Sequence, residues 1–297
     1  MTPSFPHTGI LDDPAEVTAA FQRIARIGLT EDLGYGPDLT TLTSVGPEQV
    51  GEAEVRSRQA GVLSGIDTMA MVAEVGREFE DELGGTVTVD AHRANGDRLA
   101  AGDHIATVRG NLRALLQLER TMLNVVSHAS GIATHTAAWV EAAGIAVRDS
   151  RKTLPGLRML QKRAVLHGGG TPHRWGLGDQ AMIKDNHVLS AGLLASAHKI
   201  RTEHPDLWLE VEVDTLEQLA EVLETKPQQV LLDNFTVANT RRAVEMRAEF
   251  APETLLESSG GLSFDVAADY GKTGVDSLAV GALTHSVQVL DIGLDLR

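Results

Sequence analysis

The second half of the sequence repeats one pattern, a short apolar run that ends in polar or charged residues. The six runs begin at Ile145, Gln180, Trp208, Val230, Leu255 and Ser277. Apolar residues at helical spacing fill several of the intervals, at 189–203, 216–225 and 237–250. Alternating strands and helices favour a parallel sheet, and six such units in about 150 residues favour an α/β barrel, open or closed. A doubly wound open sheet is the structural alternative.

The first half has a different pattern. Residues 51–110 form short alternating runs separated by turns such as Gly84-Gly85 and Asn95-Gly96, which predicts an antiparallel sheet. A helical stretch at 66–82 interrupts these runs. Asp13-Pro14 supplies the start of an earlier helix, which we expect to end before Gly28 and to bury the stripe Val17, Ala20, Phe21, Ile24 and Ile27.

Two further helices are expected between the halves. Apolar residues from Leu112 to Val126 have helical spacing, Gly131 predicts a break, and a second helix ends at Gly144. We therefore predict two domains in an α/β protein. Residues 1–130 form an N-terminal α+β sandwich domain with a connecting helix, to which the C-terminal end of the chain can return. Residues 131–297 form the α/β barrel.

None of the 297 residues is a cysteine. This excludes disulfides, thiolate metal sites and a cysteine nucleophile. Residues 1–7 lack the basic start and apolar stretch of a signal peptide, and no apolar run approaches the ~18 residues that span a bilayer. We expect a cytoplasmic protein that does not enter a membrane.

The formal net charge of −15 is unevenly distributed. The segment 148–187 carries +5 and the rest of the chain carries −20. We interpret Arg158, Lys162 and Arg163, at helical spacing, as a solvated helix face. Only Trp175 in this segment could stack on a base, and the overall charge repels nucleic acid. The segment therefore favours a small, multiply anionic ligand.

Groups capable of chemistry follow the ends of the predicted strands, where the loops of a barrel meet on one face. They are Arg151 with Lys152, Lys184 with Asn186, Glu212 with Asp214, Asp233 with Asn234, and Ser258 with Ser259. In the run 207–214, strand alternation directs Glu210, Glu212 and Asp214 into the barrel, where buried carboxylates need cations.

Two glycine-containing turns follow the last two predicted strands. Ser258-Ser259-Gly260-Gly261 and the turn at Gly281 can present backbone N–H groups to a phosphate. Phosphate sites of α/β barrels commonly lie in these loops.

Several ordered motifs of the chain resemble those of the quinolinate phosphoribosyltransferase family, also called nicotinate-nucleotide pyrophosphorylases (carboxylating). They are Glu119–Asn124, Asp149–Arg158, Gly168–Arg174, Gly176–Asp179, Ile183–His187, Glu210–Asp214, Leu232–Asn234 and Glu257–Gly261. The likeness covers nearly the whole chain. Ser150 stands where this family often has threonine before Arg-Lys, and the hydroxyl is kept.

The resemblance implies a type II phosphoribosyltransferase with an N-terminal α/β sandwich and an open, seven-stranded α/β barrel. It also implies a homodimer with shared active sites. The expected reaction converts quinolinate and phosphoribosyl pyrophosphate (PRPP), with Mg²⁺, to nicotinate mononucleotide, pyrophosphate and CO₂ in NAD biosynthesis.

The resemblance also implies roles for individual residues. Arg120 is expected to reach the neighbouring subunit's site, and the residues around quinolinate are Arg151, His173, Arg174 and Lys184. Lys152 and Lys184 are expected at the pyrophosphate. Glu212 and Asp233 are expected at the ribose hydroxyls and the metal, and the 5′-phosphate is assigned to Ser259, Gly260, Gly261 and Gly281.

Three alternatives stay open. A related phosphoribosyltransferase, acting on nicotinate or of the type found beside molybdate transport genes, would share the fold and the PRPP site. A metal-dependent barrel hydrolase would use His187 near Asp185, although the sequence has no His-x-His pair. A non-catalytic phosphate-binding or scaffold protein is the third.

Overall fold

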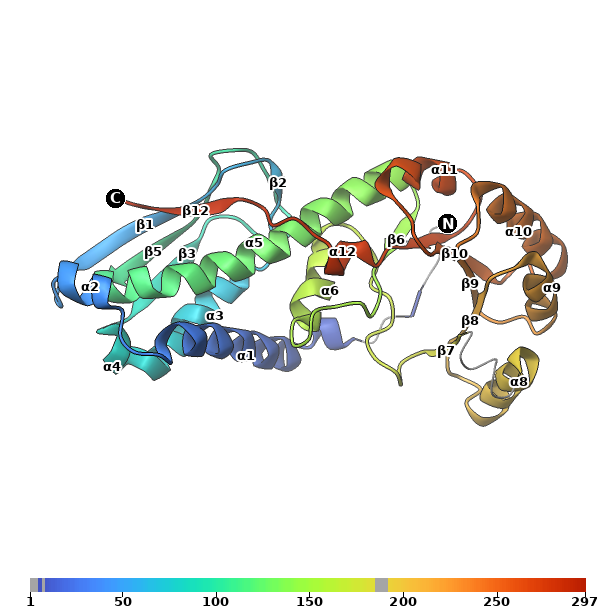
Figure 1. Ribbon diagram of the computed structural model, residues 1–297, viewed down its shortest axis with the longest axis horizontal. Helices are drawn as coiled ribbons and strands as arrows, with labels where there is room; N and C mark the ends of the chain where they lie inside the picture. The colour runs from blue at the N-terminus through green and yellow to red at the C-terminus, as the bar shows by residue number, and fades with distance from the viewer. Residues whose placement is uncertain (1–4, 7–8, 185–191) are drawn as a thin grey trace. The chain divides into compact units, whose positions relative to one another are not determined.

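The computed structural model describes residues 5–6, 9–184 and 192–297 (Figure 1). The chain divides into two compact units. The first, here called the barrel unit, comprises Met1–Thr8, Ala138–Lys152 and Gly170–Leu283. The second, the sandwich unit, comprises Gly9–Ala137, Thr153–Gly169 and Thr284–Arg297. Each unit therefore combines segments that lie far apart in the sequence.

The barrel unit contains one six-stranded parallel sheet with the order β6-β11-β10-β9-β8-β7. The strands are β6 (Ala146–Arg148), β7 (Ala181–Ile183), β8 (Leu209–Val213), β9 (Gln229–Asp233), β10 (Leu255–Ser259) and β11 (Ser277–Ala279). Strands β7 to β11 each add beside their predecessor, with no reversal of order. This winding is that of a barrel and rules out the doubly wound alternative.

A seventh position in the barrel is taken by Thr171, which forms a parallel bridge with Arg148 on the free side of β6. The Thr171 N–H donates to the Val147 carbonyl at 2.9 Å. Within the described ranges no ladder joins this segment to β7, so the barrel is open between them. The predicted incomplete α/β barrel is confirmed.

Helices follow the strands as the apolar spacing predicted. They are α8 (Leu193–Glu203), α9 (Leu216–Glu224), α10 (Val237–Phe250), η3 (Phe264–Val266), α11 (Ala267–Gly271) and α12 (Ala282–His285). The hydroxyls of Thr215 and Thr236 cap α9 and α10 by accepting from backbone N–H groups. Residues 189–191 of the helix expected at 189–203 lie outside the described residues.

The sandwich unit contains a four-stranded antiparallel sheet with the order β12-β1-β5-β3. These strands are β1 (Val50–Ser57), β3 (Val87–Ala91), β5 (His104–Asn111) and β12 (Ile292–Leu296), and a small ribbon pairs β2 (Gly61–Val62) with β4 (Arg98–Leu99). The C-terminal end of the chain returns to this unit, because Ile292 to Leu296 pair with β1.

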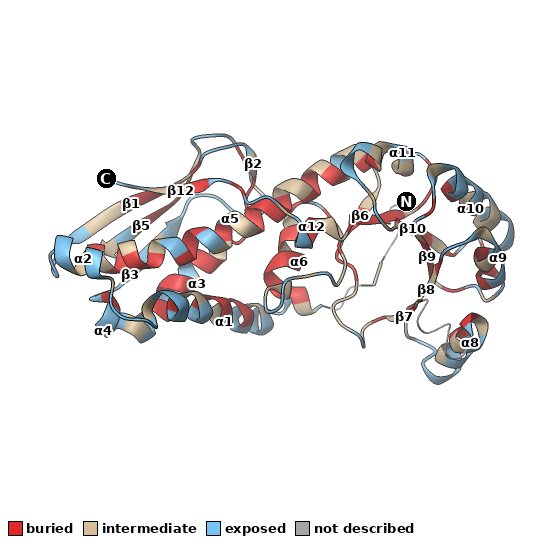
Figure 2. Ribbon diagram, viewed as in Figure 1, coloured by how far each residue is buried: buried red, intermediate tan, exposed pale blue. Residues whose placement is uncertain are grey.

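One face of this sheet is covered by helices. The helical elements of the unit are η1 (Ile10–Asp12), α1 (Pro14–Leu33), α2 (Leu39–Ser44), α3 (Ile66–Gly76), η2 (Arg77–Phe79), α4 (Glu80–Leu83) and α6 (Arg158–His167), together with most of α5 (Leu112–Ala143). Leu29, Val55, Met69, Ile105 and Leu115 meet in its core and are at most 1% exposed. Figure 2 shows buried residues repeating along α1 and α5.

Helix α5 is continuous, so the predicted break at Gly131 is wrong (Figure 1). The glycine has a packing role. A Cβ built on Gly131 would lie 2.2 Å from the Gln288 carbonyl oxygen and 2.9 Å from the Val289 Cα. Gly131 therefore lets the C-terminal segment pass close to the helix, at the modest loss of helix propensity that an internal glycine carries.

Other local predictions also need correction. Asp13 caps α1 and Pro14 is its first residue, as predicted, but α1 continues past Gly28 to Leu33 and leaves Ile27 51% exposed. Lys162 was expected on a solvated face, yet it is fully buried in α6. The spacing of charges defines a helix face but does not reveal which way that face points.

No helix in the described part of the chain combines the length and the apolar character needed to cross a membrane.

The close approach at Gly271 gives a test of the barrel unit. A Cβ there would lie 1.9 Å from the Ala143 carbonyl oxygen, whereas a Cβ at Gly46 meets only the Gln49 Cβ, at 4.0 Å. Gly271→Ala should lower the free energy of unfolding by about 1–3 kcal/mol, because backbone must move. Gly46→Ala, the control, should change it by less than about 1 kcal/mol. Equal effects in urea denaturation would contradict this packing.

Candidate active site

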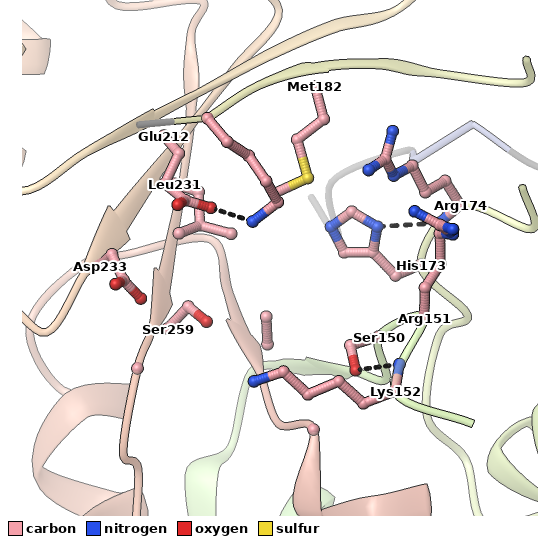
Figure 3. A pocket seen from close by; sticks show the side chains of 14 residues that line it. Ser150, Arg151, Lys152, His173, Arg174, Met182, Glu212, Leu231, Asp233 and Ser259 are labelled. Carbon is pink, nitrogen blue, oxygen red and sulfur yellow. Dashed lines mark hydrogen bonds and ion pairs between the residues drawn. The ribbon is translucent and has the colours of Figure 1, made fainter. Parts of the chain in front are cut away.

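A cavity of about 380 Å³ opens among the carboxyl ends of the barrel strands (Figure 3). All the residues that line it belong to the barrel unit. They are Ser150, Arg151, Lys152, His173, Arg174, Met182, Lys184, Glu212, Leu231, Asp233, Ser259, Gly260, Ala279 and Gly281. The sequence-based expectation that functional groups meet at this edge is therefore met by the geometry.

One side of the cavity is cationic. Arg151 and Lys152 follow β6, and His173 and Arg174 follow the Thr171 bridge. Lys184, which follows β7, contacts the carboxylate side of the cavity. Among the described residues, the Arg151 Nε is buried with no hydrogen-bond acceptor. Burial lowers the pKa of Arg174, and the neighbouring charge of Arg151 lowers it further. Crowding two guanidinium groups in this way favours an anion between them.

The opposite side carries two carboxylates. Glu212 lies on β8 and forms an ion pair with the Lys184 ammonium group. Asp233 ends β9 and accepts a hydrogen bond from the Asn234 Nδ2 at 2.7 Å. Asn234 has a left-handed backbone with φ 56°, which asparagine tolerates, and its N–H donates to the Ser259 carbonyl at 3.0 Å. This turn brings Asp233 beside the end of β10.

The turn after β10 requires glycine at one position. Gly260 has φ 83°, and a Cβ there would lie 2.6 Å from both the Asp233 Oδ1 and the Asn234 backbone nitrogen. Ser259, Gly260 and Gly281 line the cavity, whereas Gly261, also predicted here, is not among its lining residues.

Three apolar residues that line the cavity were not predicted from the sequence: Met182, Leu231 and Ala279. For one of them, the alternation of side chains along a strand could have predicted its position in the cavity. Leu231 lies two positions before Asp233 on β9, so both side chains share the face that is turned into the barrel. The same alternation places Glu210 beneath Glu212 on β8, while Asp214 lies beyond the strand and is exposed. The prediction that Asp214 points into the barrel is therefore wrong.

A fully buried charge cluster lies deeper in the barrel, on the layer below the cavity. Arg148 of β6 approaches the Glu257 carboxylate of β10, with 3.1 Å between Nη1 and Oε1, and the Gln229 amide oxygen at 3.3 Å. Ser277 donates its hydroxyl to the Glu257 Oε1 at 2.7 Å. Arg148 and Glu257 have no exposed surface.

Glu210 is the second carboxylate of this cluster. It accepts hydrogen bonds from the Gln180 Nε2 at 2.7 Å and from the Gln229 Nε2 at 3.1 Å. The His173 Nε2 lies 3.2 Å from Glu210 and 3.1 Å from Glu257. His173 therefore belongs both to the cluster and to the cavity lining.

The cluster shifts the protonation of its members. Burial favours the neutral form of Glu257, but the charge of Arg148, together with the His173 ring and the Ser277 hydroxyl, outweighs burial and lowers the pKa of Glu257 to about 2. Burial likewise opposes charge on His173, whereas the Glu210 and Glu257 carboxylates raise the pKa of His173. Because the Arg174 backbone N–H is donated to Nδ1, the ring proton that faces the two carboxylates lies on Nε2. Each charge in this layer therefore depends on the others.

Some predicted residues lie elsewhere. Arg120 lies on α5 of the sandwich unit, with its side chain 64% exposed and 3.6 Å from Glu119. Asn186 and the Asp185–His187 pair of the hydrolase alternative lie outside the described residues. Of the residues to which the resemblance gives a role, all except Arg120 and Gly261 line the cavity. Asn234 and Ser258, which were expected among the strand-end groups, are not among its lining residues.

Breaking the buried ion pair tests this arrangement. Arg148→Met should lower the free energy of unfolding by about 3–5 kcal/mol, because Glu257 loses its cation in a dry interior. The double variant Arg148→Met/Glu257→Gln should recover part of that loss, since the uncompensated charge is gone. Arg242→Met removes an exposed arginine paired with Glu245 and should change stability by at most about 1 kcal/mol. Urea denaturation that gives equal, small effects would contradict the cluster.

The family model of the quinolinate phosphoribosyl transferase C-terminal domain matches residues 132–295, and that of the N-terminal domain matches residues 38–130. Together the two domains cover most of the chain.

Curated relatives and solved structures agree with these matches. A nicotinate-nucleotide pyrophosphorylase [carboxylating] from Mycobacterium leprae is 51% identical over 95% of this chain and 98% of its own length. A probable enzyme of that name from Bacillus subtilis is 38% identical over 90% of each chain. The nicotinate-nucleotide pyrophosphorylase structure from Francisella tularensis has a TM-score of 0.84 at 31% identity, covering 94% of this chain and 97% of that one. The chain belongs to the quinolinate phosphoribosyltransferase family.

Proposed function

We propose that this protein transfers the phosphoribosyl group of PRPP to quinolinate and releases pyrophosphate and CO₂, forming nicotinate mononucleotide for NAD biosynthesis. The observation that carries the proposal is one cavity whose cationic side faces two carboxylates. The names of the relatives from Mycobacterium leprae and Bacillus subtilis support it. The protein is accordingly proposed to be a pentosyltransferase.

Quinolinate fits the cationic side. It carries two adjacent carboxylates, and the planar guanidinium forks of Arg151 and Arg174 suit such groups. The Arg151 Nε lacks an acceptor within the described residues, which a carboxylate would supply. Met182 and Leu231 add apolar surface for the flat ring.

PRPP fits the rest of the cavity. Ser259 and the glycines Gly260, Gly261 and Gly281 are proposed to hold the 5′-phosphate through hydroxyl and backbone N–H donors. Lys152 and Lys184 are proposed to meet the pyrophosphate. In this role Lys184 would exchange its partner Glu212 for a phosphate oxygen.

Glu212 and Asp233 fit a magnesium ion by the chemistry of their donors. Both offer carboxylate oxygens to the cavity, and Mg²⁺ usually binds one or two carboxylates together with substrate phosphates. When bound, Mg²⁺ would neutralise charge on the pyrophosphate. The two carboxylates would also hold the ribose hydroxyls and stabilise positive charge that develops at the anomeric carbon.

The order of bond changes follows from the chemistry of the ring. The quinolinate nitrogen forms a bond to the anomeric carbon as the bond to pyrophosphate breaks, and pyrophosphate leaves with the electron pair. The ring nitrogen is then cationic. Loss of the adjacent carboxylate as CO₂ leaves an ylide that this charge stabilises, and uptake of one proton at the ring carbon gives nicotinate mononucleotide. Arg151, Arg174 and Lys184 would hold the two carboxylates until the one beside the ring nitrogen leaves as CO₂, and they would hold the remaining carboxylate afterwards.

We also propose a homodimer in which Arg120 enters the partner's site. Its side chain is 64% exposed on the sandwich unit, which leaves it accessible to an anion bound elsewhere. A cytoplasmic location stays a prediction from the sequence, as does the identity of the metal ion.

The reaction can be tested directly with purified protein, quinolinate, PRPP and Mg²⁺. We expect nicotinate mononucleotide and CO₂ in equal amounts, and far slower turnover of nicotinate, which lacks one carboxylate. Lys152→Ala should lower kcat/KM at least about tenfold through loss of a charged contact. Lys199→Ala, which removes a lysine that is 73% exposed on α8, should leave it unchanged.

Other outcomes would support the alternatives. Equal or faster turnover of nicotinate would favour a related phosphoribosyltransferase. Hydrolysis without PRPP would favour the hydrolase, and inactivity with every substrate would favour a binding or scaffold protein.

Complementation tests the shared site. Arg120→Ala and Lys152→Ala proteins should each have at most about a tenth of the wild-type activity. Mixing them should restore activity, because a heterodimer contains one site with both side chains intact. About a quarter of the wild-type activity is expected at full exchange, since half the dimers are mixed and each holds one intact site. Mass spectrometry of differently tagged subunits verifies exchange. No recovery after verified exchange would contradict the shared site.

A further inference from the structure

The buried cluster below the cavity connects to the ligand-binding side chains through Arg174. His173 accepts the Arg174 backbone N–H on its Nδ1 at 2.8 Å (Figure 3). Its Nε2 faces Glu210 and Glu257. Both ring nitrogens thus have partners within the protein. His173 then offers a bound ligand the surface of its ring, and its nitrogens hold the main chain of Arg174 in place.

A second set of hydrogen bonds links the cluster to Arg174. The Arg174 Nη1 donates to the Gln180 carbonyl at 3.2 Å, and the Gln180 side chain donates to Glu210 at 2.7 Å. Glu210 therefore anchors both neighbours that contact Arg174, one at its backbone and one at its guanidinium group. Because Glu210 is fully buried, these hydrogen bonds do not compete with bulk water.

The far side of the cluster is covered by the N-terminal arm. The Phe5 ring lies 4.2 Å from the Arg148 Cζ, in a cation–π geometry. Within the described residues, the Arg148 Nε and Nη2 are buried and have no hydrogen-bond partner. The aromatic face thus covers the part of the guanidinium group that no acceptor reaches.

A metal ion is the competing explanation for this cluster. One nitrogen of His173 and one oxygen each of Glu210 and Glu257 lie within 4.8 Å of one another. However, Arg148 already supplies a cation at 3.1 Å from Glu257, and a divalent ion beside it would meet that positive charge. A protein cation therefore accounts for the carboxylates better than a metal does.

We propose that Glu210 and Glu257 are positioning residues for ligand binding. They hold His173 and Gln180 in place, and these two residues in turn hold Arg174. Phe5 stabilises the same cluster by covering Arg148. The inference rests on the proposed function for its kinetic consequence. A guanidinium group held in advance binds a planar carboxylate without losing further side-chain freedom. Loss of the support should weaken binding of quinolinate and leave binding of PRPP largely unchanged.

The kinetic experiment uses the full chain and compares two KM values. Glu210→Gln and Glu257→Gln should raise the KM for quinolinate about tenfold or more and change the KM for PRPP by less than about twofold. Phe5→Ala should raise the KM for quinolinate about threefold. Phe5→Tyr keeps the aromatic face and should behave as wild type, and so should Phe250→Ala, which removes a phenylalanine that is 55% exposed.

A spectroscopic measurement without substrates tests the support independently of the reaction. In protein labelled with ¹⁵N in its histidine rings, His173, assigned by its loss in His173→Asn, should show an Nε2-bound proton strongly deshielded by the carboxylates. Glu257→Gln and Phe5→Ala should shift this resonance, and Phe250→Ala should not.

Folded Glu210→Gln and Glu257→Gln proteins with an unchanged KM for quinolinate, or with both KM values raised equally, would overturn the proposal. If the glutamate variants do not fold, a wild-type KM and an unshifted His173 resonance in Phe5→Ala would overturn it. Stoichiometric metal in the purified protein that is lost in Glu257→Gln would also overturn it. A wild type that does not turn over quinolinate would refute the proposed function, whereas the His173 resonance would still decide the positioning role.

Discussion

The structure of the site depends on one constraint, that two carboxylates, Glu210 and Glu257, are buried inside an α/β barrel. Isolated charges in such an interior would be strongly destabilising, so they need cations and hydrogen-bond donors at close range. Arg148 supplies the cation and Ser277 donates to the same Glu257 oxygen, while Gln180 and Gln229 donate to Glu210. The His173 Nε2 lies 3.1 Å from the second Glu257 oxygen. Because the cluster joins β6, β8, β9 and β10, it fixes the strand ends that carry the cavity. The buried charge cluster therefore supports the residues that line the cavity.

Charge also explains how an acidic protein can hold anions. The net charge of −15 repels polyanions at long range, while the cationic side chains gather at one cavity edge. The cationic groups at that edge repel one another, since burial and the charge of Arg151 both lower the pKa of Arg174. A small dianion relieves this repulsion, whereas a large polyanion is also repelled by the net negative charge of the protein. Selectivity for a compact ligand follows from this distribution.

Much of this could be predicted because it depends on local pattern. The alternating runs after Gly144 revealed the parallel barrel, and the polar residues after them, such as Arg151 and Asp233, do line the cavity. Features that depend on distant contacts could not be foreseen. Gly131 looked like a helix break because its partner, the segment at Gln288, lies far along the chain. Likewise the pairing of Arg148 with Glu257 joins residues 109 positions apart, and only the barrel brings them together.

A crystal structure of the protein with quinolinate would test the central claim, that the cationic side of this cavity is built for a dicarboxylate. The account predicts that the two carboxylates contact the guanidinium groups of Arg151 and Arg174, with the ring beside Met182 and Leu231. Quinolinate bound at the Ser259–Gly260 turn, or outside the cavity, would contradict it.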